Sequence, residues 1–518
     1  MNHSRRQVLG AAAALPLLAA ARGAPQDTDL DVAVVGGGVS GVYTAWRLKR
    51  ARPHWRVGLF EMSGRIGGRL RSVAFPQAPH LVAEVGGMRF LEAQRHVFNL
   101  AKKLNLPMRG YPVRLPADRM LLRGRDLSVG EFGQRGKFFP YAMKPSGQLP
   151  SSPLFAEAMA RIVPGAGKMN AAQWLKARSS MRYKGRLLKD WSAWALLSDV
   201  FTAEEMRFFR DSSGYDDIAD YENGLDEFDY LFLADDESRP FFTLAGGYQR
   251  LPLALAEEAR RLGVEVMTES TLALLQARRD GFALFFTGRR RMARGAKKVV
   301  LAMPRRALEP VEGIGDDPRI APLLATVTPV PACKALLLYA KPWWRDIGIA
   351  AGRSVTDMPA RQFYALGAET ERLASEPANG MGVLMMYSDG PNVARWDELV
   401  DPAPAANAGF QWLGPDSQLA AEMHREASLV YRTAPPAPLA ACYQDWTAAP
   451  YGGGWHYWAR GCDGRALAGH VMQPLPGRDL YICGEAYGIY SSGWVEGALE
   501  RAETMLQKHF GLAKAEWL

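Results

Sequence analysis

Residues 36–41 form a glycine-rich G-x-G-x-x-G segment. This segment follows a β-rich run at 31–35 and opens an apolar helix that reaches about residue 50. Gly36 permits a tight turn, Gly38 lets the backbone approach a pyrophosphate, and Gly41 allows a helix to pack closely on a strand. Glu61 ends a second strand, 20 residues after Gly41, where a carboxylate accepts hydrogen bonds from ribose hydroxyls. The pattern predicts dinucleotide binding by a βαβ unit, and the alternative is a purely structural glycine turn.

Further glycine and acidic signals lie beyond this unit. The loop 64–69 carries three glycines and two arginines just after Glu61, where it could hold more phosphate or the edge of a flavin. Near the C-terminus, Glu485 follows an apolar strand at 480–483, and a helix begins near Trp494. The positive end of that helix would favour negative charge on a flavin. Together with segments 302–304 and 493–499, these segments span nearly the whole chain and resemble the flavin amine oxidase superfamily. The resemblance implies bound FAD and an aromatic side chain, Trp494, beside the substrate.

The segment 84–90 bears on the subclass. It reads Glu-Val-Gly-Gly-Met-Arg-Phe and resembles L-amino acid oxidases, in which an arginine at the Arg89 position binds the substrate carboxylate; monoamine oxidases lack that arginine. A guanidinium offers a planar fork that pairs with a carboxylate through two charge-assisted hydrogen bonds. Tyr387 ends an apolar strand at 382–386 and matches the tyrosine that L-amino acid oxidases use beside the arginine. A structural ion pair is the alternative for Arg89.

Two more positions gain a role from the resemblance. Lys334 begins an apolar strand at 334–339, and strand alternation places it on one face with Leu336 and Leu338. The superfamily keeps a lysine there, holding a water at flavin N5. Trp455 occupies the place at which monoamine oxidases carry the cysteine that links covalently to the flavin, so a non-covalent FAD is predicted. His456 follows and is predicted to line the site; a hydrogen-bonded structural histidine is the alternative.

The predicted site therefore has three groups of residues. Catalytic roles go to Lys334 and Trp494. Substrate binding goes to Arg89, Tyr387, Gly493, Trp494 and His456. Cofactor binding goes to Gly36, Gly38, Val39, Ser40, Gly41, Glu61, Met62, Gly68, Arg69, Gly86, Gly87, Met88, Arg89, Val266, Gly484, Glu485, Trp494 and Val495.

Composition excludes several other classes. The chain has 518 residues, 48% of them hydrophobic, with a formal net charge of +9. It has no run of lysine and arginine interleaved with aromatics, so nucleic-acid binding is not expected. The four cysteines form no CxxC pair and no cluster with histidine at zinc spacing, so neither a metal site nor a disulfide framework is expected.

The first 24 residues predict export. Arg5 and Arg6 precede an alanine- and leucine-rich run from residue 10 to 21, followed by small residues suited to cleavage. The paired arginines resemble a twin-arginine signal, which exports folded proteins. The alternative is a basic tail with a chance apolar helix. The mature protein is expected in the periplasm or outside the cell, without stable membrane insertion, and a homodimer is an open prediction.

The pattern of elements predicts an α/β fold. A discontinuous, Rossmann-like FAD-binding domain is expected from residues 30–75, 244–305 and 470–512, and a mixed-sheet substrate domain from 76–135 and 306–469. Residues 136–243 are expected to form a helical insertion, with helices at 171–177 and 187–197.

The predicted reaction is oxidative deamination of an L-amino acid with oxygen, giving a 2-keto acid, ammonia and hydrogen peroxide. Three alternatives stay open at this point: an amine or polyamine oxidase in which Arg89 is structural, an L-amino acid monooxygenase, and a flavin-fold binding protein without turnover. The sequence does not indicate which side chain is accepted.

Overall fold

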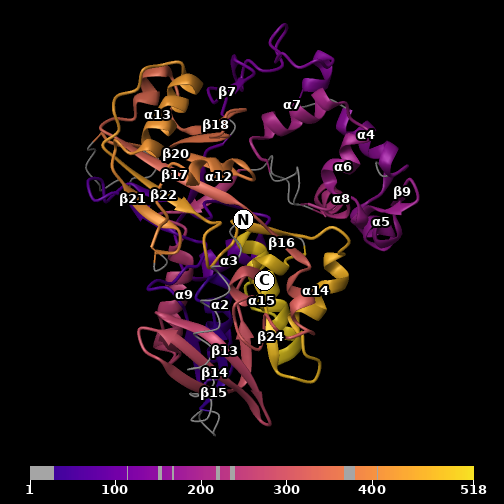
Figure 1. Ribbon diagram of the computed structural model, residues 1–518, viewed down its shortest axis with the longest axis vertical. Helices are drawn as coiled ribbons and strands as arrows, with labels where there is room; N and C mark the ends of the chain where they lie inside the picture. The colour runs from indigo at the N-terminus through magenta and orange to yellow at the C-terminus, as the bar shows by residue number, and fades with distance from the viewer. Residues whose placement is uncertain are drawn as a thin grey trace, which may run out of the picture.

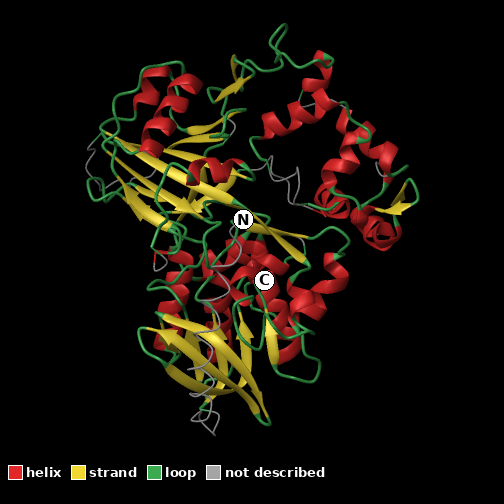
Figure 2. Cartoon of the chain, in the orientation of Figure 1, coloured by secondary structure: helices red, strands yellow, loops and turns green. Residues whose placement is uncertain are grey.

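The computed structural model describes residues 29–518, apart from 114, 150–153, 166–167, 217–221, 234–239, 367–379, 405–406 and 490. The predicted signal at 1–24 lies outside the described residues. Two large sheets and a group of helices make up the described chain (Figure 1). Figure 2 shows one sheet in the lower part of the view, the other at upper left, and helices at upper right. The chain therefore has the mixed α/β architecture that the sequence predicts.

The lower, seven-stranded sheet is built from three distant parts of the chain. Its strand order is β12-β2-β1-β15-β14-β13, and β24 also pairs with β15. The strands next to β1 are parallel, whereas β13, β14 and β15 form antiparallel pairs. The bounds are β1 Leu30–Val35, β2 Val57–Phe60, β12 Glu265–Met267, β13 Ser270–Arg278, β14 Gly281–Gly288, β15 Met292–Leu301 and β24 Leu480–Ile482. Strands buried on both faces read as continuous apolar runs, as β1 and β2 do.

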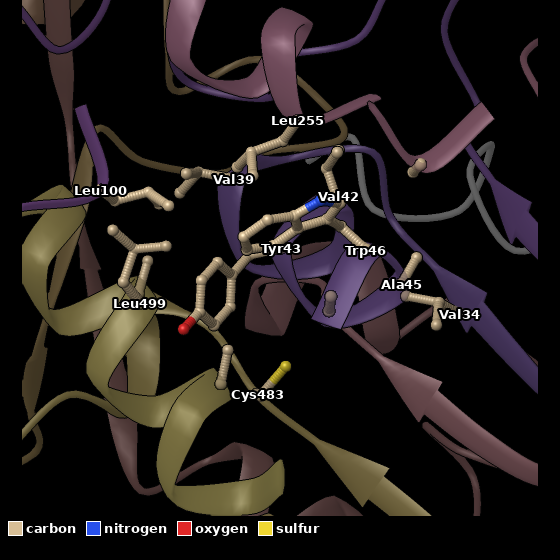
Figure 3. Packing of buried hydrophobic residues seen from close by; sticks show 14 of the residues in the cluster. Val34, Val39, Val42, Tyr43, Ala45, Trp46, Leu100, Leu255, Cys483 and Leu499 are labelled. Carbon is tan, nitrogen blue, oxygen red and sulfur yellow. The ribbon is translucent and has the colours of Figure 1, made fainter. Parts of the chain in front are cut away.

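Helices α9 Arg250–Arg261 and α15 Val495–Phe510 each pack on α2 Val39–Ala51 beside this sheet, and α3 Arg95–Lys103 packs on α15. Figure 3 shows Tyr43 and Trp46 of α2 among side chains from the strands and the other helices. Glu503 of α15 pairs with Arg47 at 2.9 Å and accepts a hydrogen bond from the Tyr43 hydroxyl at 2.7 Å. The first and last helices of the described chain are thereby fixed together, which places the N-termini of α2 and α15 near one cavity.

The eight-stranded sheet is mixed, with the order β21-β22-β17-β20-β19-β18-β7-β8. Only its β18–β7 pair is parallel. Leu336 and Leu338 of β17 pack in one apolar cluster, while Ala335 and Leu337 pack in another with α13, so the predicted alternation is confirmed. The bounds are β7 Arg119–Leu122, β8 Arg125–Ser128, β17 Ala332–Tyr339, β18 Gly352–Thr356, β19 Gln362–Leu366, β20 Gly382–Asp389, β21 Phe410–Leu413, β22 Ala440–Asp445, α12 Asn392–Asp397 and α13 Gln418–Tyr431.

The helical insertion packs around its own apolar cluster, which includes Trp174, Leu196 and Phe228. The helix expected at 187–197 is wrong as a single element. Leu187 ends strand β10, a 3-10 turn follows at Leu188–Asp190, and Ser192 caps a new helix by accepting a hydrogen bond from the Ala195 N–H. The bounds are α4 Leu154–Ile162, α5 Ala171–Ala177, β9 Arg182–Tyr183, β10 Arg186–Leu187, α6 Ala193–Ser198, α7 Ala203–Ser213 and α8 Gly224–Leu233.

Smaller elements connect these parts. A three-stranded sheet has the order β5-β11-β6, and β16 pairs with β23. Among the helices of the described residues, none combines the length and the apolar composition needed to cross a bilayer. The bounds are β3 Ser72–Ala74, β4 Val82–Glu84, β5 Phe90–Leu91, β6 Met108–Tyr111, β11 Phe241–Leu244, α10 Arg305–Leu308, α11 Ala321–Leu324, β16 Val327–Val330, β23 Trp455–Trp458 and α14 Gly464–Met472.

Candidate active site

The glycine loop after β1 has the geometry that its spacing predicts. Gly36 has a φ of +109°, and a Cβ there would lie 2.4 Å from the Ala302 carbonyl oxygen. A Cβ on Gly41 would lie 1.9 Å from the Gly36 carbonyl oxygen, so only glycine lets α2 start this close to β1. Gly38 is the N-cap of α2 and, as a glycine, has no side chain that could cap the helix. The first N–H groups of α2 are thus available to an anion.

Glu61 lies directly after β2 and is buried beside this loop. Its Oε2 accepts a hydrogen bond from the Gly37 N–H at 2.6 Å. Its Oε1 accepts from the Ser63 N–H at 2.8 Å and from the Ser63 hydroxyl at 2.6 Å. These bonds fix the carboxylate beside the glycine turn, which is the position a ribose-binding acid requires.

A second glycine segment meets this loop, and a third meets the second. The Gly67 N–H donates to the Gly37 carbonyl at 2.9 Å, and Gly68 has a φ of +56°, with a Cβ position 3.0 Å from the Gly38 Cα. A Cβ on Gly86 would lie 2.1 Å from the Arg69 carbonyl oxygen. Three backbone segments therefore approach one another at distances that side chains would prevent.

A cavity of about 470 Å³ lies where these segments face α15 and the eight-stranded sheet. Most of the predicted site residues line it. These are Gly36, Gly38, Val39, Ser40, Glu61, Met62, Gly68, Arg69, Gly86, Gly87, Met88, Arg89, Lys334, Tyr387, Gly484, Glu485, Gly493, Trp494 and Val495.

Three predicted residues do not line this cavity. Gly41 faces the β1 turn instead, where it allows the helix to pack. Val266 lies in β12, paired with Leu59, and the next part of the chain, 270–272, lines the cavity in its place. His456 is fully buried behind the wall. Neighbouring residues of a strand point to opposite sides, so Trp455 lines the cavity while His456 turns away from it.

His456, Glu485 and Arg69 form a buried charged cluster. Glu485 accepts hydrogen bonds from the backbone N–H groups of His456 and Gly493, both at 2.9 Å, and pairs with Arg69 at 2.6 Å. Burial alone would raise the pKa of Glu485, but Arg69 and His456 outweigh it and lower that pKa to about 2. Burial lowers the pKa of His456. Glu485 is therefore a fixed carboxylate that holds the start of α15 against β23.

Arg89 lines the same cavity as Glu61. Its side chain is buried, its guanidinium carbon lies 4.3 Å from the centre of the Phe241 ring, and its Nη1 donates to the Tyr364 hydroxyl at 3.3 Å. The Trp494 ring lies parallel to Phe241, with centroids 6.2 Å apart. The Phe241 ring thus contacts both the guanidinium and the indole, and an aromatic face stabilises a guanidinium placed over it.

Lys334 lies beside Arg89 and Tyr387. It is directly opposite Tyr387 in the β17–β20 ladder, and its ammonium lies 5.0 Å from the centre of that ring. Lys334 donates hydrogen bonds to the carbonyls of Gly86 at 2.6 Å and Glu84 at 3.3 Å. Burial lowers the pKa of Lys334 to about 7, although the Glu84 carboxylate opposes this shift. The amine can therefore gain or lose a proton near neutral pH.

Comparison with known families fits this geometry. Residues 39–504 match the family described as flavin-containing amine oxidoreductase. The chain belongs to this family. As a flavin amine oxidoreductase, it is similar to aplysianin-A of Aplysia kurodai, with 27% identity over 93% of the chain and 91% of that protein. It is also similar to achacin of Lissachatina fulica, with 24% identity over 93% of both chains.

Other similarities concern oxidases of named substrates. An L-amino-acid oxidase of Demansia vestigiata is 26% identical over 69% of this chain and 65% of its own length. Among solved structures, a putrescine oxidase bound to putrescine has a TM-score of 0.68 at 17% identity, covering 93% of this chain and 99% of that one. Cyclohexylamine oxidase from Brevibacterium oxydans has a TM-score of 0.66 at 18% identity, with the same coverage. The structural similarities show that the fold is that of flavin amine oxidases.

The flavin of this family fits the cavity of this chain. The three glycine segments form a cradle that Cβ atoms would fill, and Glu61 stands at the end of β2 beside it. The groups suited to a dinucleotide line the same cavity as Arg89, Lys334 and Tyr387. The glycine segments and Glu61 could therefore hold the phosphates and ribose of the flavin nucleotide.

Sequence reasoning missed several aromatic residues beside Arg89 and Tyr387. Tyr215 of the insertion lines the cavity, and its ring meets Tyr387 edge-on with centroids 5.9 Å apart. Phe241 and Tyr364 hold Arg89, as described above. None of the three lies in a motif; each is a single aromatic in an apolar or loop segment, so no local signal separates it from a core residue.

Proposed function

We propose that this flavin amine oxidoreductase is an L-amino acid oxidase. It converts an L-amino acid, oxygen and water into a 2-keto acid, ammonia and hydrogen peroxide. The observation that carries the proposal is Arg89, a buried guanidinium that lines the cavity and rests on Phe241. A fixed planar cation at the substrate end can pair with a substrate carboxylate, whereas a simple amine carries no negative group for it to bind. Similarity to L-amino-acid oxidases supports the same conclusion.

In this proposal Arg89 and Tyr387 bind the substrate carboxylate. Tyr364 and Phe241 keep the guanidinium in place, because one accepts its hydrogen bond and the other lies against its face. Trp494 and Trp455 line the same cavity and exclude water from the substrate. Excluding water and fixing the substrate lower the barrier by orientation.

FAD, when bound, accepts the two electrons of the substrate and passes them to oxygen. Gly36, Gly38 and the N-terminus of α2 would hold its pyrophosphate, and Glu61 its ribose. Lys334, with its pKa lowered to about 7, can hold or release a proton on the cavity wall during turnover. The substrate amine needs no separate protein base when it binds unprotonated.

We further propose that FAD is bound without a covalent link. Trp455 stands where related enzymes carry a linking cysteine, and none of the four cysteines lines the cavity. Cys333, Cys442 and Cys483 are buried elsewhere in the fold.

Export by a twin-arginine signal belongs to the same proposal, since the Arg5-Arg6 pair precedes an apolar run. The periplasm, or the outside of the cell, would be the site of action. The division into three domains and the formation of a homodimer also stay predictions; size-exclusion chromatography with light scattering of the purified protein tests the homodimer.

An amine oxidase is the second candidate, favoured by the structural similarity to putrescine and cyclohexylamine oxidases. One experiment separates the two. Peroxide release by the purified holoenzyme is measured with the twenty L-amino acids and with the amine that each gives on decarboxylation. We expect turnover of amino acids well above that of their matched amines. Preference for the amines would contradict the proposal, and carbon dioxide with a carboxamide product would indicate a monooxygenase.

A further inference from the structure

One segment of the helical insertion reaches the cavity in the described part of the chain. Helix α7 ends at Ser213, and Gly214 caps it in the left-handed region with a φ of 76°. The next residue, Tyr215, lines the cavity, and its ring meets the Tyr387 ring edge-on at 85°. The insertion thus supplies a wall beside one of the two residues proposed to hold the substrate carboxylate.

Two residues of the eight-stranded sheet hold this segment. Gln362 of β19 donates from Nε2 to the Gly214 carbonyl at 2.8 Å. Arg353 of β18 donates to the Ser213 carbonyl, and its guanidinium carbon lies 5.2 Å from the centre of the Tyr215 ring. A Cβ on Gly214 would lie 2.8 Å from Arg353 Nη2 and 3.0 Å from Gln362 Cγ. The backbone before Tyr215 therefore packs tightly on the sheet.

The amide oxygen of Gln362 is connected to Arg89 through the Tyr364 hydroxyl. This oxygen, Oε1, accepts hydrogen bonds from Arg353 Nε at 2.8 Å and from the Tyr364 hydroxyl at 2.9 Å. The Tyr364 hydroxyl in turn accepts the hydrogen bond of Arg89 Nη1 at 3.3 Å. Gln362 is fully buried, and a buried amide keeps one orientation when donors face its oxygen and a carbonyl faces its nitrogen. A continuous chain of hydrogen bonds therefore links Arg89 to the Tyr215 segment.

The residue after Tyr215 is fixed as well. The Asp216 N–H donates to Asp389 Oδ2 at 3.0 Å, and its carboxylate accepts from Arg210 Nε and Asn392 Nδ2, both at 2.5 Å. Asp216 and Asp389 are almost wholly buried. Because the backbone is held on both sides of Tyr215, its ring forms a rigid wall of the cavity.

We propose that Gln362 is a positioning residue that sets Arg89 and Tyr215 at once, and that Tyr215 selects the substrate side chain. Rings of Tyr215, Tyr387 and Trp455 line the cavity, with Tyr387 and Trp455 centroids 6.4 Å apart. Among the described lining residues the acids are Glu61 and Glu485. Glu61 accepts hydrogen bonds from Gly37 and Ser63, and Glu485 pairs with Arg69. The wall therefore suits large apolar or aromatic side chains. The inference rests on the proposed function, because it assigns the substrate carboxylate to Arg89 and the substrate side chain to Tyr215.

The Tyr215 part is tested by substrate selectivity. Tyr215→Ala should lower kcat/KM for L-phenylalanine and L-leucine roughly tenfold more than for L-alanine, because a large side chain loses the apolar surface it packs on. Tyr215→Phe keeps the ring and should keep the wild-type ratio. An equal loss on large and small amino acids, or a wild-type preference for basic ones, would overturn the assignment.

Two Gln362 variants separate its two contacts. Gln362→Leu removes both and should raise KM roughly tenfold, with kcat less affected, and shift selectivity as Tyr215→Ala does. Gln362→Glu keeps an acceptor for Arg353 and Tyr364 but places an oxygen against the Gly214 carbonyl. It should keep KM near wild type and still shift selectivity. Identical effects of the two variants would refute the separation.

Gln444 offers a matched control. It is also fully buried, lies in the same ladder row on the other side of Lys334, donates to the Ala408 carbonyl at 2.9 Å and accepts from Arg71. Gln444→Leu should cost comparable thermal stability without changing selectivity. A selectivity shift in Gln444→Leu equal to that in Gln362→Leu would mean that any buried glutamine of the sheet has this effect, and would refute the link.

Double-mutant cycles then test the link directly. Effects of Gln362→Leu should be non-additive with Arg89→Ala on KM and with Tyr215→Ala on selectivity, since linked residues share one contribution. Additive effects in both cycles would overturn the proposal. If the enzyme oxidises only amines, the proposed function fails, and the Gln362–Tyr215 cycle run with the best amine still decides whether the two residues are coupled.

Discussion

Arg89 carries the assignment to L-amino acids, so Arg89→Ala is the most informative substitution. The guanidinium is buried against Phe241. Without it, a bound carboxylate would be desolvated and would lose its charged partner. Breaking such a buried pair costs about 3–5 kcal/mol, or roughly two to three and a half decades in kcat/KM. Arg89→Lys should lose much of this as well, because an ammonium lacks the planar fork.

The assay compares kcat/KM for the best amino acid with that for its decarboxylated amine, in wild type and variant. The amine has no carboxylate, so its low turnover should change little. A selective loss on the amino acid is expected. Equal losses on both substrates would contradict carboxylate binding by Arg89 and would mean that Arg89 holds the fold or the flavin.

Arg71 provides a partly buried control arginine that also lies against an aromatic ring. Its guanidinium carbon lies 4.0 Å from the centre of the Phe410 ring and its Nη1 donates to Gln444 Oε1 at 3.4 Å, yet it is not among the lining residues of the cavity. Arg71→Ala should therefore reduce stability without a selective loss on amino acids. A selective loss in this variant too would show that the assay reports general damage to the sheet.

Three further predictions concern the cofactor and the buried charges. Acid precipitation of the holoenzyme should release all flavin into the supernatant, and colour left in the pellet would contradict non-covalent binding. Lys334→Met should slow the reaction of the reduced enzyme with oxygen in stopped-flow measurements while KM stays roughly constant; an unchanged rate would count against a role for Lys334. Burial raises the pKa of Glu84 to about 7, above its unfolded value, so folding stability should fall as pH rises from about 4.5 to 7. Glu84→Gln should lack this part of the fall in thermal melts, and an identical pH dependence would disprove the assignment.

The cofactor end of the site could be predicted from the sequence because backbone needs determine it. The turn at Gly36 requires a positive φ, Gly41 must pack on that turn, and Glu61 must end the next strand. Each requirement selects one residue type at a fixed spacing along the sequence. The start of α15 near Trp494 and the alternation of β17 were also predictable, because local periodicity determines them.

The substrate end could be predicted only in part, because long-range packing builds it. Phe241 lies under Arg89 through the pairing of β11 with β5 and β6, which no local pattern encodes. Tyr215 depends on the contact of α7 with β18. His456 was expected at the cavity because it follows Trp455, but successive residues of a strand face opposite sides, so only Trp455 lines the cavity.

The cofactor end and the substrate end should differ in how they tolerate substitution. At the cofactor end, glycine contacts leave no room for a side chain: a Cβ on Gly41 would overlap the Gly36 carbonyl at 1.9 Å. Substitution there should remove flavin binding and so all activity alike. At the substrate end, one ladder row places Gln362, Tyr387 and Lys334 on adjacent strands, and the insertion adds Tyr215 to them. Substitutions of Gln362 or Tyr387 in that row should alter which amino acid is oxidised while the flavin cradle stays intact, whereas Lys334 also bonds to the Gly86 carbonyl of the cradle. Selectivity can therefore change in this fold without loss of the redox chemistry, because the two ends depend on different parts of the chain.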